Sequence, residues 1–182
     1  MGACVDGTSN TIAMGESAKL NDPDGWPNVD SSTTNLKSGV VAASDDTIAH
    51  SESARLTNCL GPLKIDRAGK RILPGQQTRS GRGTVLYGAN SNNSFHTVLP
   101  PNSVNCQPGT PGNQLGGWGI FSASSYHTGG VMVALMDGSV TFVSDTINSQ
   151  STSNPSQVMS GPSQFGIWGG MGTPNGGESV SF

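Results

Sequence analysis

The chain carries little charge. Only 12% of its 182 residues are Asp, Glu, Lys or Arg, about half the share in an average soluble domain. The formal net charge is −3 and no Lys/Arg cluster occurs, which argues against a nucleic-acid partner. No apolar run approaches the ~20 residues of a membrane-spanning helix, and no signal peptide is visible. We therefore expect a chain with no membrane span and no nucleic-acid function.

Cysteine is also scarce. The three cysteines form no C-x-x-C pair, which argues against a structural zinc site. In an exported domain, three cysteines are read as one disulfide and one remaining thiol. We favour a bond between Cys59 and Cys106, because Cys59 ends a helix-like segment and Cys106 lies in the loop before a hairpin. Cys4 is then left over.

Glycine and proline are plentiful, with 26 and 11 residues. Such a content approaches the level at which low complexity is suspected, yet the apolar residues are grouped in runs of strand length. This grouping favours a loop-rich β protein over disorder, and the length suits one domain, residues 1–182, with a sizeable core. The polar residues are largely Ser, Thr, Asn and Gln, which is common in secreted proteins and compatible with a carbohydrate ligand. A small ester is the other ligand that we consider.

Residues 121–143 are the most informative segment. His127-Thr-Gly-Gly130 indicates a turn, residues 131–136 a buried strand, Asp137-Gly138 a tight turn and residues 139–143 the returning strand. An Asp-Gly pair between two β-branched runs is a strong hairpin signal, because Gly supplies the positive φ that the turn needs.

Weaker patterns indicate the remaining elements. We expect strands over residues 8–16, 84–88 and 95–99, the last ended by a Pro-Pro pair. Ser and Asp at the start of residues 44–59, with a loose apolar stripe, predict a short helix. The Ser-rich residues 149–163 are predicted to form a mobile loop.

Four segments carry a family resemblance. They are residues 6–16 with DGTSNT, residues 95–106, the H-x9-DG spacing from His127 to Asp137, and residues 166–178 with a Trp, a Gly-Thr and a Gly-Gly-Glu. In this order they resemble the prepilin-like H-x9-DG proteins of planctomycetes, the family called domain of unknown function 1559.

The resemblance implies an architecture more than an activity. It implies a pseudopilin-like globular head, mainly β (α+β), in which an antiparallel sheet packs against one short helix. Members of the family begin with a prepilin leader and a long apolar helix, whereas this chain starts at the DGTSNT segment. We therefore expect a C-terminal portion of a prepilin-like head, soluble as it stands, with an exposed N-terminal sheet edge. Full-length members are expected outside the cell or in its envelope.

His127 and Asp137 are the first candidates for chemistry. They flank an extended strand and could lie as far as roughly 35 Å apart, so both are read first as turn residues. The functional reading makes His127 a metal ligand or general base, meeting His96 from a neighbouring segment.

Calcium is the candidate cofactor. Asp22, Asp24, Asn28 and Asp30 are spaced somewhat like oxygen ligands of a calcium loop, and some pseudopilins bind calcium in a surface loop. The Gly stands at the fourth place rather than the sixth and no Glu closes the loop, so this is not an EF-hand. A solvated turn is the competing interpretation.

Other side chains admit competing roles. A Ser-His-Asp hydrolase would use His127 or His96 with Asp137 or Asp6, but the chain has no G-x-S-x-G elbow. The three tryptophans could form a sugar-stacking face, although core packing is favoured. Arg79 and Arg82 are expected to pair with an internal carboxylate such as Glu16 or Glu178.

Two functions follow from these observations. We expect a structural or adhesive head whose partners are envelope or filament proteins, including its own copies. The alternative is a hydrolase acting on ester, lactone or glycosidic bonds, with His127, Asp137 and His96 or a bound metal at its centre.

Overall fold

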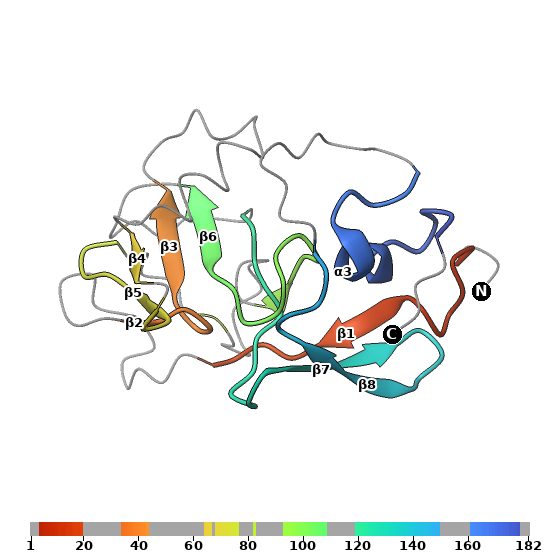
Figure 1. The fold of residues 1–182 in the computed structure, drawn as a ribbon, viewed down its shortest axis with the longest axis horizontal. Helices are drawn as coiled ribbons and strands as arrows, with labels where there is room; N and C mark the ends of the chain where they lie inside the picture. Colours follow the sequence, from red (N-terminus) through yellow and green to blue (C-terminus); the bar gives the residue numbers. More distant parts are fainter. Residues whose placement is uncertain are drawn as a thin grey trace.

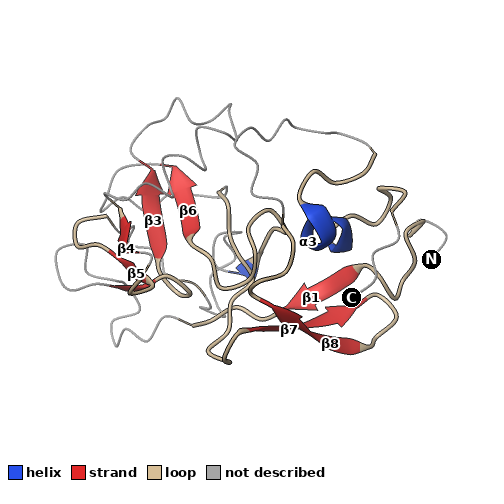
Figure 2. Ribbon diagram, viewed as in Figure 1, coloured by secondary structure: helices blue, strands red, loops and turns tan. Residues whose placement is uncertain are grey.

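The computed structural model of the chain describes eight stretches: residues 4–19, 34–43, 64–66, 68–76, 82, 93–108, 119–149 and 161–178. Every structural statement below concerns these residues. They fold mainly as strands and loops (Figures 1 and 2), as the sequence predicts. Within them, no helix is long and apolar enough to cross a membrane.

The largest sheet holds three antiparallel strands in the order β1-β7-β8: β1 (Ile12–Gly15), β7 (Gly130–Leu135) and β8 (Val140–Ser144). Helix α3 (Gly166–Met171) covers one face of this sheet (Figure 1). A buried apolar cluster fills the space between them, formed by Ala123, Val131, Val133, Leu135, Val143, Trp168 and Met171. The apolar residues of β7 therefore define the core face of the sheet.

The β7–β8 hairpin confirms the strongest sequence prediction. Gly138 has a φ of 87° and its N–H donates to the carbonyl of Leu135 at 3.0 Å. At the other end of β7, Gly129 has a φ of 80°. Glycine supplies both left-handed residues at no steric cost, which is why these turns form where the sequence places them.

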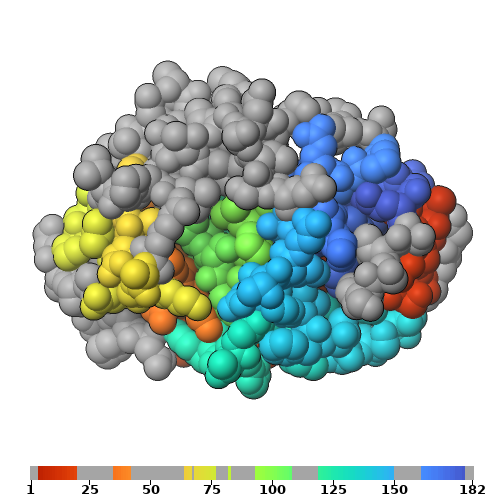
Figure 3. All heavy atoms as spheres, viewed as in Figure 1, coloured from red at the N-terminus to blue at the C-terminus, as the bar shows by residue number. Residues whose placement is uncertain are grey.

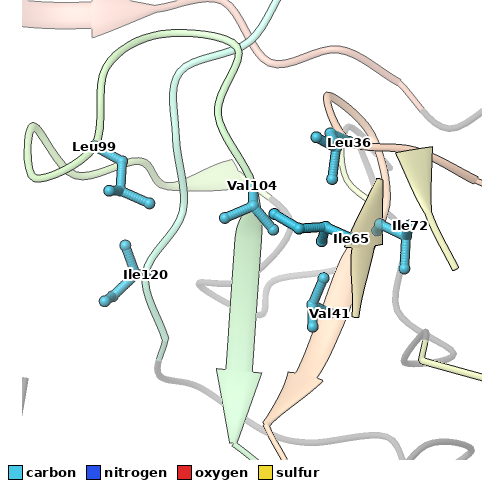
Figure 4. Close-up of a cluster of buried hydrophobic side chains, with 7 residues drawn as sticks. All are labelled: Leu36, Val41, Ile65, Ile72, Leu99, Val104 and Ile120. Atoms are coloured by element: carbon cyan, nitrogen blue, oxygen red, sulfur yellow. The ribbon is translucent and has the colours of Figure 1, made fainter. Parts of the chain in front are cut away.

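A second group of strands lies beside the first (Figure 2). The very short β2 (Thr34–Asn35), β5 (Arg71–Ile72) and β4 (Ile65–Asp66) form one antiparallel sheet, and β3 (Val40–Ala43) pairs in parallel with β6 (Asn105–Pro108). Figure 4 shows the buried side chains that join them: Leu36, Val41, Ile65, Ile72, Leu99, Val104 and Ile120.

Two sequence predictions are wrong in detail. The strand expected over residues 8–16 is restricted to β1, because residues 8–10 form a turn. Residues 95–99 are not a strand: among the described residues their one backbone–backbone hydrogen bond runs from the N–H of His96 to the carbonyl of Phe121 at 2.7 Å. A Pro-Pro pair follows and prevents a ladder from continuing.

Helix α3 was not expected in a Gly-rich segment. Gly interrupts helices in isolation, so tertiary packing forms this one. Trp168 and Met171, three residues apart, are both fully buried on its inner face. A side chain at Gly169 would collide with Ser163 and Phe165. The helix expected at residues 44–59, the strand at 84–88 and most of the Ser-rich loop at 149–163 lie outside the described residues.

Candidate functional site

His127 lies in the exposed turn that leads into β7. Its Nε2 is 3.4 Å from Oε1 of Glu16, with side-chain exposures of 65% and 34%. The His127 backbone N–H donates to Oγ of Ser125 at 3.2 Å. No described serine hydroxyl bonds the His127 ring, so the nucleophile of a catalytic triad is missing from the described part of the site.

Glu16 is the partner of His127 that sequence reasoning missed. Its Oε2 accepts the N–H of Met132 at 2.8 Å, and its backbone N–H donates to the carbonyl of Met132 at 3.3 Å. Its own carbonyl accepts the N–H of Ser124 at 2.9 Å. Glu16 therefore ties β1 to β7 and to the preceding segment, and the ion pair with His127 is a minor surface addition.

Asp137 caps the β7–β8 turn. Its Oδ1 accepts the hydroxyl of Ser139 at 2.6 Å and the backbone N–H of Ser139 at 2.9 Å. These two bonds, the hydroxyl first, lower the pKa of Asp137. Its N–H donates to the carbonyl of Thr8 at 3.1 Å. His127 and Asp137 thus stand at opposite ends of β7, which spans roughly 20 Å, and the structure does not bring them together.

His96 packs flat against Phe121, with ring centroids 5.9 Å apart and an interplanar angle of 25°. Its Nδ1 accepts the backbone N–H of Phe121 at 3.3 Å. Burial and then the charge of Arg82 lower the pKa of His96. The ring is therefore neutral, with its proton on Nε2.

This tautomer limits what His96 can do. A metal ligand or general base needs a free lone pair on a ring nitrogen. The lone pair of Nδ1 is already used by Phe121, and Nε2 carries the proton. His96 can only donate a hydrogen bond outward without breaking its contact with Phe121. No hydrogen bond or ring contact joins His96 to His127 among the described residues, so their meeting stays a prediction.

Arg82 is fully buried, and its charge acts on His96. It donates to the carbonyls of Ser94 at 2.7 Å and Ser122 at 3.3 Å, and its guanidinium lies 5.3 Å from the centre of the Phe121 ring. Burial lowers the pKa of Arg82 to about 10, so it stays charged at neutral pH. Among the described residues Arg82 makes no ion pair with Glu16 or Glu178, and Arg79, the other arginine of that prediction, lies outside the described residues.

Glu178 and Asp6 instead fasten the C-terminal motif to the body of the domain. Oδ2 and Oδ1 of Asp6 accept the N–H groups of Gly176 and Gly177, each at 2.7 Å. Oε1 of Glu178 accepts the N–H of Ser163 at 3.0 Å and the hydroxyl of Thr173 at 3.1 Å. The first and last motifs of the sequence therefore meet in space, and no local sequence pattern predicts this contact.

Asn102 joins the second motif to its neighbours in the same way. It adopts a left-handed conformation, with a φ of 61°. Its Oδ1 accepts the N–H of Ser125 at 2.9 Å and its Nδ2 donates to the carbonyl of Gly130 at 3.2 Å. Trp168 of the last motif donates its indole N–H to the carbonyl of Leu99 at 2.8 Å. All four motifs thus interlock through hydrogen bonds.

A cleft of about 980 Å³ opens between β1, residues 93–98 and residues 161–173. Phe95, His96 and Phe165 line it together with several hydroxyl and amide side chains, and none of the described residues that line it carries a charged side chain. The hydroxyl of Ser163 in its wall accepts the N–H of Phe165 at 3.2 Å. The cleft is suited to an uncharged ligand, but its described wall holds no paired nucleophile and base.

The structure describes only some residues of the remaining predicted sites. Asp22, Asp24, Asn28 and Asp30 lie outside the described residues, as do Cys59, Trp26, Trp118 and Arg79. Within the described stretches, no group of three or more His, Cys, Asp or Glu could hold a metal ion. Cys106 is buried in β6, while Cys4 is a free thiol that donates to the hydroxyl of Thr11 at 3.2 Å. The bond between Cys59 and Cys106 stays a prediction.

Comparison with protein families settles the ancestry of this interlocked fold. A family model labelled SBP_bac_10 and described as a protein of unknown function (DUF1559) matches residues 1–150. The chain belongs to the DUF1559 family. No curated protein and no solved structure matches it. The DUF1559 match spans three of the four motifs, and the fourth, in residues 166–178, is joined to the first by Asp6.

Proposed function

We propose that this DUF1559 domain is the structural or adhesive globular head of a prepilin-like envelope or filament protein. One observation carries the proposal: the polar residues of the family motifs are engaged in holding the fold together. Asp6, Glu16 and Asn102 each bond backbone groups of another motif or of its flanking turn. A motif whose polar groups are used internally is explained by folding, without a substrate.

The proposed location is the cell envelope or the extracellular space. The low charge and the Ser, Thr, Asn and Gln content suit an exported protein, and a disulfide between Cys59 and Cys106 would suit an oxidising compartment. The proposed partners are envelope or filament proteins, including further copies of the chain. The uncharged cleft beside β1 would accept a carbohydrate or another neutral ligand in an adhesive role.

A hydrolase acting on ester, lactone or glycosidic bonds is the rival proposal. The exposed His127 beside Glu16 favours it, because a carboxylate can orient an imidazole that acts as a base. Two facts weigh against it. No described nucleophile bonds the His127 ring, and Asp137 lies at the far end of β7.

Turnover and metal content separate the two proposals. Purified protein would be analysed for bound elements by mass spectrometry, with and without chelator, and then assayed on ester, lactone and glycoside substrates. For a structural head we expect no turnover and no stoichiometric transition metal. Turnover that is lost in His127→Ala would replace the structural proposal with the hydrolase. This holds if His127→Ala melts normally and if the control variant Asp145→Ala keeps its turnover.

Calcium has its own outcome in the same experiment. If calcium alone is bound and raises the melting temperature without activity, the loop containing Asp22, Asp24, Asn28 and Asp30 becomes a candidate stability site. The variant Asp24→Asn should then remove the calcium-dependent rise. If the rise persists in that variant, the calcium lies elsewhere.

The structural proposal also needs a positive result. Antibody labelling of intact and permeabilised cells that express the full-length protein should place the head outside the cytoplasmic membrane. Labelling that requires permeabilisation of that membrane would contradict the proposed location.

A further inference from the structure

Strand β8 is an outer edge of the three-stranded sheet, with β7 as its single neighbour. It lies at the lower margin of the molecule in Figure 1, and the turquoise segment containing it forms part of the surface in Figure 3. The strand contains no charged residue, no proline and no bulge. Those are the devices with which proteins normally block an exposed edge.

The register shows which backbone groups the edge leaves open. The N–H of Leu135 donates to the carbonyl of Ser139 and the N–H of Asp145 to that of Gly129, both at 2.8 Å. Hydrogen-bonding direction alternates along an antiparallel strand, so Thr141 and Val143 bond β7. The N–H and C=O groups of Val140 and Phe142 point outward, and none of them bonds a described residue.

The side chains beside this edge are apolar as well. Val140 and Phe142 are 61% and 49% exposed, and Met14 across the same face of the sheet is 68% exposed. Met132 and Ala134 of β7 lie between them on that face. A sheet with one solvated face normally alternates apolar and polar residues, whereas this one is apolar on both faces. Exposed apolar area of this kind marks an interaction surface.

We propose that β8 pairs with β8 of a second copy of the chain, antiparallel and about a two-fold axis at Phe142. The two three-stranded sheets would then form one continuous sheet. Phe142 would lie opposite Phe142 of the second copy, and Val140 opposite Ser144. The pairing satisfies the outward N–H and C=O groups of Val140 and Phe142, and aromatic pairs across neighbouring strands add to sheet stability.

A second copy fits this edge better than a charged partner. The strand offers no charge to complement an acidic or basic peptide. A two-fold interface requires one surface to match itself, and an uncharged five-residue strand does so in length and register. The contact is small compared with the ~1,600 Å² of a standard interface, so the dimer is weak and forms at high concentration.

The inference goes beyond the proposed structural role and does not depend on it. None of the hydrogen bonds that tie the motifs together involves the outward groups of β8. An enzymatic activity would overturn the structural role and leave the pairing of β8 untouched.

Sedimentation velocity over a wide range of protein concentration tests the pairing. Wild-type protein should pass from monomer to dimer, and Phe142→Lys should raise the dissociation constant at least about tenfold, because two like charges would meet at the axis. Met14→Lys places the same charge on the same face at the opposite edge. It should leave the dissociation constant within about twofold.

A backbone variant separates pairing from side-chain packing. Val140→Pro removes one outward N–H at the first residue of β8, where proline is tolerated on an edge strand. It should weaken the dimer while the monomer melts normally. Val140→Pro also keeps the pairing testable if Phe142→Lys misfolds, since the Phe142 ring packs over Gly130.

Amide hydrogen exchange reports the register directly. The exchange of Val140 and Phe142 should slow as protein concentration rises, while that of Gly15 on the opposite edge should not change. A wild-type protein that stays monomeric would overturn the proposal. So would association that Met14→Lys weakens as much as Phe142→Lys does, or assemblies that grow beyond the dimer.

Discussion

The two halves of the domain satisfy their buried backbone by different means. Around β1, β7 and β8, strands of four to six residues form a three-stranded ladder with one irregularity in β1 between Ile12 and Met14, and motif side chains bond its ends. Around β2, β5 and β4, each strand is two residues long. The neighbouring pair β3 and β6 is longer, with four residues in each strand, and at its start one buried amide adds side-chain hydrogen bonds to the backbone. Nδ2 of Asn105 donates to the carbonyls of Leu36 and Gly39 at 3.1 Å, and its Oδ1 accepts the N–H of Ser122 at 3.0 Å.

The contrast teaches where each half is vulnerable. A continuous ladder spreads its hydrogen bonds over many residues, so its apolar core is the sensitive part. A half built from short strands depends on single side chains, since a buried carbonyl that loses its donor bears the full desolvation cost. The apolar cluster of Figure 4 still holds this second half together.

The largest effect is expected in the first half, at Trp168. Its side chain is fully buried, stacks on Phe95 at 6.3 Å and bonds the carbonyl of Leu99. Trp168→Ala should lower the free energy of unfolding by about 3–5 kcal/mol, measured by urea denaturation. Ile72→Ala in the other cluster should cost less, about 2–4 kcal/mol. Equal or reversed costs would remove the distinction between the two cores.

The predicted disulfide would strengthen the second half. If Cys106 pairs with Cys59, Cys106→Ser should cost about 2–4 kcal/mol of unfolding free energy, whereas Cys4→Ser should have little effect. Mass spectrometry of an unreduced digest should find the Cys59–Cys106 peptide pair, with Cys4 alkylated. A peptide that joins Cys4 to either partner would refute the pairing.

The amide of Asn105 distinguishes the halves most directly. Asn105→Ala removes the amide donor to the carbonyls of Leu36 and Gly39, and we expect a loss of about 2–3 kcal/mol. Asn35→Ala is the matched control, because it removes an exposed amide bonded to Lys37 and should cost under about 0.5 kcal/mol. Urea denaturation of both variants would decide, and a small cost for Asn105→Ala would sink the comparison.

Asp6 tests the ties between motifs in the first half. Asp6→Asn keeps the shape but replaces one of two accepting oxygens with an N–H₂ donor, which cannot accept the N–H of Gly176 or Gly177. We expect a loss of about 1–2 kcal/mol, measured by thermal unfolding. A Tm equal to that of the parent protein would mean that the motif ties are dispensable.

The smallest effect is the pH dependence contributed by His96, at the junction of the two halves. Its pKa in the folded protein lies below its ordinary value of 6.5, so the unfolded chain binds the proton more readily. The stability contribution is therefore fully present above pH ~6.5 and is lost as the pH falls through the folded pKa. NMR titration of the ring should give a midpoint below 6.5, and His96→Gln should flatten this acid dependence of Tm. A midpoint above 6.5 would contradict the neutral tautomer.

Sequence reasoning succeeded where local chemistry decides. The β7–β8 hairpin follows from Asp137-Gly138, because a left-handed turn between apolar runs has few alternatives. It failed for α3, because the glycines of this segment disfavour a helix and burial of Trp168 stabilises one. It also failed for residues 95–99, which were expected to form a strand but pair with no strand in the described part of the chain.

The candidate site divides in the same way. The turn role of Asp137 was predicted from its place before a glycine, and the structure confirms it. The partners of His127, Arg82 and Asp6 could not be predicted, since each is distant in sequence: Glu16, Ser122 and Gly176. The residue types indicate that these groups are polar, but contacts between distant segments determine which partners they bond.

The amino-acid sequence by itself therefore determined the β-rich class, the hairpin, the low charge and the four motifs. These depend on turn chemistry, local periodicity and composition, which act over a few neighbouring residues. Only the tertiary structure decided that the motifs bind one another, that His96 is neutral with its Nδ1 bonded to the N–H of Phe121, and that β8 remains an open edge. Those properties depend on which backbone groups find partners once distant segments have packed, and a linear pattern does not contain that information.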